Sequence, residues 1–174
     1  MAFSGEPAVT KIRPCYSVAA IVLAIGLWGN AASAQNALHP IPAAECQSFA
    51  GQIQGAVGFA MKAGEDDFTD LANGAEGRSC HIAGSAANQN VASPRDLVTK
   101  IAAAFSAWRD DPSRDADAPD GSTRGFLSGN RIAELDVSWE PGPGVTCSDK
   151  QPLSACNVAP QQKLWNIVVD IVEK

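Results

Sequence analysis

Hydrophobic residues recur along this chain with two different periods, which predict helices and strands. The first helical pattern covers residues 43–57 and carries an apolar residue every three or four positions: Cys46, Phe49, Ile53 and Val57. Glycines weaken this pattern, because each costs about 1 kcal/mol relative to alanine in a helix. Alternation toward Met61 leaves a strand as the alternative for the second half. We expect a helix to Val57 and then a short strand through Met61.

The second helix has the clearer signal, and it begins at Ser93. Ser93 is a suitable N-cap, Pro94 suits the first helical position, and Asp96 completes a capping box. An apolar stripe follows: Leu97, Ile101, Ala104, Phe105 and Trp108. We expect the helix to run until Asp110-Asp111-Pro112 ends it.

Strand patterns occupy much of the remaining chain. Residues 78–84 read as a strand with Ser79, His81 and Ala83 on one face and Cys80 and Ile82 on the other. Residues 125–127 and 131–139 read as a hairpin around a Gly129-Asn130 turn. In its second strand, the residues expected to face the core alternate with Glu134, Asp136, Ser138 and Glu140: Ala133, Leu135, Val137 and Trp139.

A last strand is expected over residues 164–172, with Trp165, Ile167, Val169 and Ile171 facing inward. Residues 65–77 and 112–122 are acidic and contain glycine, so we expect loops there, and residues 141–162 form a cysteine-bearing loop. The predicted class is α+β, with an antiparallel sheet of about four to five strands, two helices packed on one face and two disulfides.

The first 34 residues resemble a secretory signal peptide. Lys11 and Arg13 precede an apolar run from Ser17 to Trp28, and Ala32-Ser33-Ala34 follows. An uncleaved anchor is the alternative, but the run is shorter than the ~20 residues that a membrane span needs. We expect a cleaved signal over residues 1–34, an extended arm over residues 35–42 and one domain over residues 43–174, placed in the periplasm or outside the cell.

Charge narrows the classes of partner. The full chain has a net charge of −6, and removing residues 1–34 would lower it to −7. Clustered Lys and Arg are what bind phosphates, so a nucleic-acid partner is not expected. The mature protein is likewise expected to have no membrane partner. The net charge itself is most simply interpreted as solubility.

The cysteines predict a disulfide framework. Cys15 would leave with the signal, and four remain: Cys46, Cys80, Cys147 and Cys156. An even number in an exported chain favours disulfides, and three pairings are possible. We favour Cys46–Cys80 and Cys147–Cys156, since the second pair closes a short loop that Pro152 helps to turn. A cysteine metal site is the alternative, but neither C-x-x-C nor Cys/His clustering occurs.

Known motifs for catalysis, phosphate binding or dinucleotide binding do not occur. The sequence assigns no catalytic residue and leaves it open whether the protein is an enzyme, and no cofactor or metal is expected. The two histidines are His39, in the N-terminal arm, and His81, beside Cys80. His81 could act as a general base with Ser79, but the sequence shows nothing that would orient the two. A surface or hydrogen-bonding role is the simpler interpretation.

Two acidic clusters are candidates for ligands or acid–base groups. One is Asp66, Asp67 and Asp70, and the other is Asp110, Asp111, Asp115, Asp117 and Asp120. The second misses the calcium-binding EF-hand register, because its glycine is one residue late and Phe126 stands where Glu is needed. We interpret both clusters as solvated loop charge.

Several segments resemble a group of small exported proteins of Gram-negative bacteria: Arg78-Ser-Cys-His, Trp108-Arg-Asp-Asp, Ala118-Pro-Asp-Gly-Ser, Ser138-Trp-Glu-Pro, the Cys147 to Cys156 loop and the closing Leu-Trp-Asn-Ile-Val strand. The resemblance implies export and disulfides and no particular activity. The resulting hypothesis is a non-enzymatic exported envelope protein that binds another protein or a small ligand. The alternative is a periplasmic hydrolase using Asp66, Asp67 or Asp70 with His81.

Overall fold

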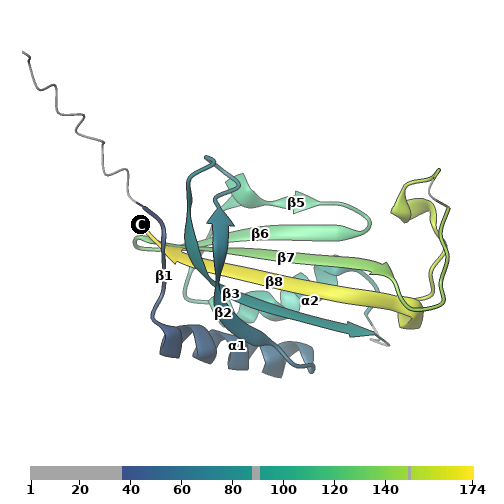
Figure 1. Cartoon of the computed structure of the whole chain (residues 1–174), viewed down its shortest axis with the longest axis horizontal. Helices are drawn as coiled ribbons and strands as arrows, with labels where there is room; N and C mark the ends of the chain where they lie inside the picture. The colour runs from purple at the N-terminus through teal and green to yellow at the C-terminus, as the bar shows by residue number, and fades with distance from the viewer. Residues whose placement is uncertain (1–36, 88–90, 149) are drawn as a thin grey trace, which may run out of the picture. The chain divides into compact units, whose positions relative to one another are not determined.

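The computed structural model describes residues 37–87, 91–148 and 150–174, so the predicted signal peptide and Cys15 lie outside the described residues. The predicted α+β class with two helices and an antiparallel sheet is confirmed (Figure 1). The helices are α1 (Ala43–Val57) and α2 (Pro94–Ala102). The strands are β1 (His39–Pro40), β2 (Lys62–Thr69), β3 (Glu76–Ala87), β4 (Arg109–Asp110), β5 (Ala116–Asp117), β6 (Gly121–Ser128), β7 (Arg131–Pro141) and β8 (Lys163–Glu173).

The sheet has eight strands in the order β2-β3-β8-β7-β6-β4, with β1 paired to β8 and β5 to β6. The prediction of four to five strands was too small. Five strands are eight residues or longer, and the three additional strands have two residues each. Gly129, at φ 61°, forms the predicted turn, so that Ser128 pairs with Arg131. Strand pairs of two residues leave no periodic signal in a sequence, which explains the undercount.

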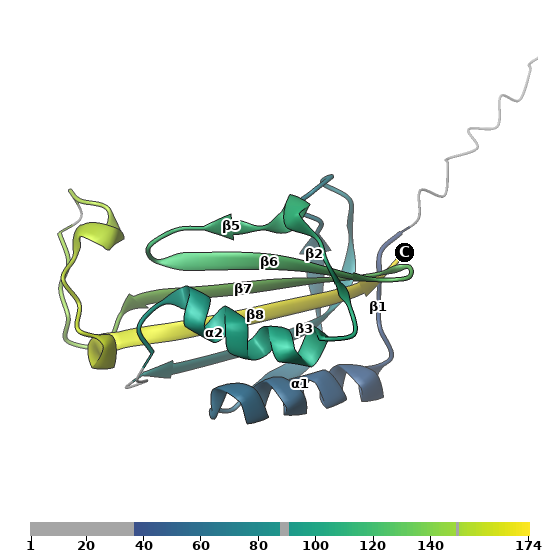
Figure 2. The same ribbon diagram turned by 180° about the vertical axis from the view of Figure 1, so that it is seen from behind.

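The hydrophobic core lies between the helices and one face of the sheet. Figure 2 shows α1 and α2 on the same side of the sheet. The residues predicted to face inward on β7 and β8 are buried there: Ala133, Leu135, Val137, Trp139, Trp165, Ile167, Val169 and Ile171. Phe105 lies between the two layers, stacked on Phe49 of α1 at 5.3 Å and on Phe126 of β6 at 4.8 Å between ring centroids.

The predicted start of α2 is confirmed and its predicted end is not. Ser93 and Asp96 form the capping box, but the α-helix ends at Ala102. A 3-10 turn, Ala103–Phe105, follows, and the amide of Trp108 donates to the carbonyl of Phe105. A 3-10 turn keeps an apolar spacing of three residues, so the sequence pattern continued past the end of the α-helix.

Two predicted loops contain regular structure. β2 occupies residues 62–69, so the short strand expected through Met61 and the loop expected over residues 65–77 were both misplaced. β2 lies at the edge of the sheet and buries only Phe68, so it lacks the alternating pattern of an inner strand. Residues 112–122 contain a 3-10 turn (Pro112–Arg114), β5 and the start of β6.

Two disulfides are present, Cys46–Cys80 and Cys147–Cys156, which are the pairs that the sequence favours. Cys46 and Cys80 are buried and join α1 to β3, whereas Cys147 and Cys156 are partly exposed in the loop between β7 and β8. Among the described residues, neither helix has the length and apolar character needed to cross a membrane.

Burial predicts the order in which the disulfides are reduced. We expect mild dithiothreitol to reduce Cys147–Cys156 before Cys46–Cys80, because a thiolate must reach the sulfur that it attacks. Alkylation followed by peptide mass mapping measures this order. Reduction of the buried Cys46–Cys80 pair first would contradict the prediction.

Loop length predicts how much each disulfide stabilises the fold. The variant Cys46→Ala/Cys80→Ala should lose about 4 kcal/mol of unfolding free energy, and Cys147→Ala/Cys156→Ala about 2.5 kcal/mol.

Candidate functional site

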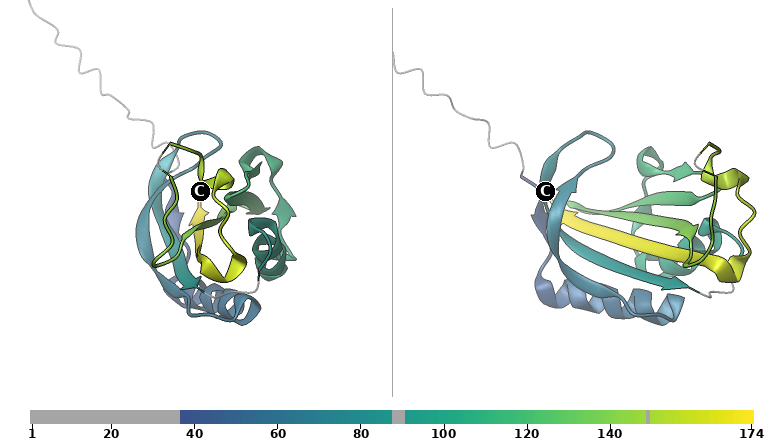
Figure 3. Two further views of the ribbon diagram at one scale, coloured as in Figure 1. Left: turned by 90° about the vertical axis from the view of Figure 1, so that its right-hand side faces the viewer. Right: turned by 45° about the vertical axis from the view of Figure 1, so that its right-hand side comes forward.

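The sheet face opposite the helices carries a row of polar residues across its central strands. His81 of β3, Asp170 of β8, Glu134 of β7 and Gly125 of β6 lie directly opposite one another from strand to strand. They belong to one face because the alternate residues on these strands face the helices. We call this the outer face. Figure 3 shows the β2–β3 hairpin on one side of it and the segment that contains β5 on the other.

Arg114 connects these two sides. Its Nη2 donates to both carboxylate oxygens of Asp70, at 2.6 and 2.7 Å, and its Nε donates to Glu134 at 2.8 Å. Its Nη1 also donates to Asp111. Asp70 follows β2, so a single guanidinium joins the β2–β3 turn, the 3-10 turn before β5 and the centre of the sheet. The backbone amide of Leu71 donates to the same Glu134 oxygen.

The Arg114 cluster is buried, with Asp70 1%, Arg114 6% and Glu134 8% exposed. Burial opposes the charge of Arg114, but its hydrogen bonds and charge contacts with Asp70 and Asp111 raise its pKa above the ordinary value. Burial also raises the pKa of Glu134, aided by the negative charge of Asp70. Three carboxylates therefore share one cation. The expectation of solvated loop charge was wrong for Asp70 and Asp111. The strand pattern predicted that Glu134 faces solvent, but Glu134 is buried.

Gly125 makes the position of Arg114 possible. A Cβ atom on Gly125 would lie 2.7 Å from the Cβ of Arg114 and 2.8 Å from the carbonyl oxygen of Asp111. The 3-10 turn therefore rests directly on the backbone of β6, and the amide of Asp111 donates to the carbonyl of Gly125. Only a residue without a side chain allows this approach.

A cavity of about 280 Å³ opens on the outer face, and we call it the outer trough. Its floor comes from β6, β7 and β8, and its walls from the end of the β2–β3 hairpin and from Arg114. The residues that line it are Asp67, Phe68, Thr69, Leu71, Arg114, Thr123, Arg124, Glu134, Leu135, Asp136, Val168 and Asp170. Its two cations already have partners, since Arg114 holds Asp70, Asp111 and Glu134, and Arg124 holds Asp115 and Asp117.

Asp136 differs from the other carboxylates of the trough. It lies two residues after Glu134 on β7 and opposite Val168 of β8. Burial raises its pKa, and a hydrogen bond with Ser138 opposes that shift. Among the ion pairs of the described residues, none joins Asp136 to a cation. The floor therefore contains a partly desolvated carboxylate without a basic partner.

His81 is oriented by a residue that the sequence analysis did not identify. Its Nδ1 lies 2.9 Å from Oδ1 of Asp170, and the Ser79 hydroxyl donates to the same oxygen at 2.6 Å. A carboxylate only accepts hydrogen bonds, so Nδ1 carries the hydrogen and Nε2 holds the lone pair of the neutral ring. Because the Ser79 hydroxyl donates its hydrogen bond to Asp170 and not to His81, Ser79 and His81 do not form a nucleophile–base pair.

The other acidic candidates lie in several places. Asp67 lines the trough, and its carboxylate pairs with Arg78 at 2.8 Å. Asp66 lies on the exposed β2, opposite Ser79 of β3. Asp117 accepts from Ser122, Arg95 and Arg124, which lower its pKa to about 2. Asp110 is exposed on β4, and Asp115 accepts from the amide of Gly125. Asp120, on the turn before β6, bonds through its carbonyl to the amide of Trp139.

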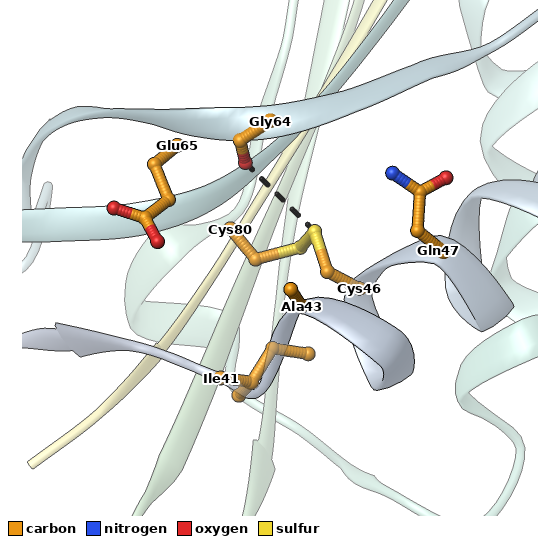
Figure 4. Close-up of a pocket in the computed structure, with 7 residues that line it drawn as sticks. All are labelled: Ile41, Ala43, Cys46, Gln47, Gly64, Glu65 and Cys80. Atoms are coloured by element: carbon orange, nitrogen blue, oxygen red, sulfur yellow. Dashed lines mark hydrogen bonds between the residues drawn. A yellow bond between two sulfur atoms is a disulfide. The ribbon is translucent and has the colours of Figure 1, made fainter.

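A second cavity of about 210 Å³ lies over the Cys46–Cys80 disulfide (Figure 4). Ile41 and Ala43 line it beside the sulfurs, and Gln47 and Glu65 lie at its sides (Figure 4). The Sγ of Cys46 is 3.9 Å from the carbonyl oxygen of Gly64. A disulfide sulfur has no hydrogen to donate, so this is a packing contact. The second cavity has one carboxylate, Glu65, and we favour the outer trough as the site.

Among the described residues, no group of three His, Cys, Asp or Glu side chains is placed to hold a metal ion. Comparisons with protein-family models, with curated proteins and with solved structures each found no match. The chemistry of the site therefore has to be argued from its own residues.

Arg114 gives the first stability prediction for this site. Arg114→Met keeps the unbranched stem of the side chain but removes the guanidinium, which leaves the buried Asp70 and Glu134 and the half-buried Asp111 without their cation. We therefore expect a loss of about 3–5 kcal/mol of unfolding free energy. Arg124→Met is the matched control, because Arg124 and its partners are more exposed and such pairs contribute about 0–1 kcal/mol. Urea denaturation at neutral pH measures both. Equal losses for the two variants would contradict the structural role of Arg114.

For Asp136 we predict the opposite effect on stability, because its substitution should raise the unfolding free energy. Its pKa is raised in the folded protein, so the folded state favours the neutral acid, and this contribution to stability is lost as the pH rises through the folded pKa. We therefore expect Asp136→Asn to be more stable than wild type at about pH 7, within the ~0.5–2 kcal/mol typical of single stabilising substitutions. The gain should vanish at pH values below the ordinary pKa of aspartate, about 3.9.

Urea denaturation across this pH range measures the gain, with Asp110→Asn as the control. Asp110 is exposed and does not line the trough, so its substitution removes the same charge from the chain without relieving burial. A loss of stability for Asp136→Asn at neutral pH would show that the charged carboxylate has a favourable partner in the fold.

Proposed function

We propose that this chain is an exported, non-enzymatic binding protein that holds a small cationic ligand in the outer trough. Export is supported by the two disulfides, which persist in oxidising compartments, and by the leader-like pattern of residues 1–34. The resemblance to small exported proteins of Gram-negative bacteria points to the same compartment, periplasmic or secreted.

Asp136 is the observation that carries the proposal. A folded domain is stabilised by only about 5–15 kcal/mol, so a partly desolvated carboxylate that favours unfolding needs a reason to be kept. An ammonium or guanidinium group placed beside Asp136 would remove the desolvation penalty and complete its charge pairing. Arg114 and Arg124 do not do this, because both are paired with other carboxylates.

The dimensions of the trough favour a small ligand over a protein surface. Its volume of about 280 Å³ lies just below the ~300–1,000 Å³ range of small-molecule pockets. Leu71 is the one large hydrophobic side chain that is strongly exposed among the described residues, and it lines the trough itself. A protein-docking surface usually has a broader apolar patch. Val168 and Phe68 offer apolar contact to the hydrocarbon part of such a cation.

A carboxylate-dependent hydrolase receives less support. The candidates from the sequence do not converge on one reacting centre: Asp70 is bound to Arg114, Asp67 to Arg78, and His81 to Asp170. The raised pKa values of Glu134 and Asp136 are compatible with acid–base chemistry, but the described residues offer no activated nucleophile beside them. Binding requires only the features that the trough has.

A binding experiment tests the proposal. We expect the cation agmatine to shift backbone amide resonances of residues that line the trough, whereas the anion glutarate and the neutral 1,5-pentanediol do not. Asp136→Asn should weaken agmatine binding at least tenfold, which corresponds to about 1.4 kcal/mol. Asp110→Asn should bind like wild type. Equal affinity for the three probes, or binding that ignores Asp136, would overturn the proposal.

A further inference from the structure

We propose that His81 makes the cation affinity of the outer trough depend on pH, so that a bound cation is released under mildly acidic conditions. This inference rests on the proposed function and concerns the regulation of the same site. It depends on the contact between His81 and Asp170, because Asp170 lines the trough and His81 lies beside it on the next strand.

The contact places a titratable group directly against a carboxylate of the site. Nδ1 of His81 is 2.9 Å from Oδ1 of Asp170, and the two side chains are 29% and 18% exposed. When the ring is neutral, Asp170 keeps its full negative charge toward the trough. When the ring takes up a proton on Nε2, an imidazolium stands next to Asp170 and neutralises it. Histidine is the side chain that ordinarily changes its charge between about pH 5 and 8.

The space beside His81 allows its second nitrogen to be reached by protons and solvent. The residue opposite His81 on β2 is Gly64, and a Cβ atom added there would have no atom within 4 Å. No hydrogen bond from a described residue reaches Nε2. The ring is therefore held on one side by Asp170 and open on the other, which suits a group that gains and loses a proton without rearrangement of the strands.

Other charged groups face this region and must be separated from His81. Asp66 and Lys62 belong to β2, where Asp66 lies opposite Ser79 of β3 and Lys62 opposite Ala83 of β3. Glu134 of β7 lies opposite Asp170 of β8, and Asp136 and Arg114 line the trough. Burial raises the pKa of both Glu134 and Asp136, so these carboxyls add a pH dependence of their own. A variant of His81 alone retains that contribution.

Coulomb's law sets the size of the effect. His81 and Asp136 stand two strands apart and two residues apart along the strands, a separation of about 12 Å, because Asp136 is in register with Ala83 through Val168. An effective dielectric constant of ~40 then gives roughly a threefold change in binding constant for one added charge. Linkage requires the reverse as well, so binding of the cation must release protons from the protein when His81 is partly protonated.

The experiment compares the affinity for agmatine at about pH 8 and about pH 6, around the ordinary titration range of histidine. Isothermal calorimetry is performed on wild type, His81→Gln and His39→Gln. Glutamine keeps an N–H donor for Asp170 and cannot become charged. His39 is exposed on β1 and is the other histidine of the chain, so its variant is the matched control.

We expect wild type and His39→Gln to lose about threefold in affinity at the lower pH, and His81→Gln to lose clearly less. Repeating the titration in two buffers of different ionisation enthalpy should show proton release for wild type and not for His81→Gln. Binding that is unchanged between the two pH values, or a loss that is equal in His81→Gln, overturns the inference and leaves the proposed function intact. Absence of agmatine binding at both pH values overturns both.

Discussion

The buried guanidinium of Arg114 is the interaction on which the outer face depends. Three carboxylates from three parts of the chain meet at this one cation: Asp70 after β2, Asp111 before the 3-10 turn and Glu134 in β7. Removing water from such a set is costly, and the cost is met only because every polar partner is in place. Hydrophobic residues could hold these segments equally well, but they would not leave a polar cavity beside them. The cluster thus builds a trough wall and supplies part of its charge.

The two faces of the sheet have different roles: one face packs the hydrophobic core, and the other carries the polar groups of the candidate site. The helix face contains the aliphatic and aromatic core, with Phe49, Phe105 and Phe126 stacked through the layers. The outer face carries the carboxylates, including Asp136, whose charge favours the unfolded state. A sheet can hold such a face only when the opposite face buries enough apolar surface to offset it, which is the arrangement on β7 and β8.

Sequence patterns predicted the parts of the fold that depend on local periodicity. The first turn of α2, the Gly129-Asn130 hairpin and the inward residues of β7 and β8 follow from capping, turn chemistry and alternation. β2 was not predicted because this edge strand has no apolar alternation. The site was not predicted because it depends on pairs of polar side chains that are far apart in the sequence. Arg114 and Asp70 are 44 positions apart, and His81 and Asp170 are 89 apart. Nothing local marks Glu134 as buried and Asp136 as unpaired, since both alternate with apolar residues in the same way.

β3 shows how the covalent and electrostatic features are joined. Cys80 lies between Ser79 and His81, and strand alternation turns its sulfur toward α1 while the two neighbours face Asp170. A shift of β3 by one residue would break the disulfide and would also move both hydrogen bonds to the wrong face. The disulfide with Cys46 therefore holds the register that places His81 beside the trough. Formation of the disulfide and placement of His81 beside Asp170 therefore depend on the same register of β3.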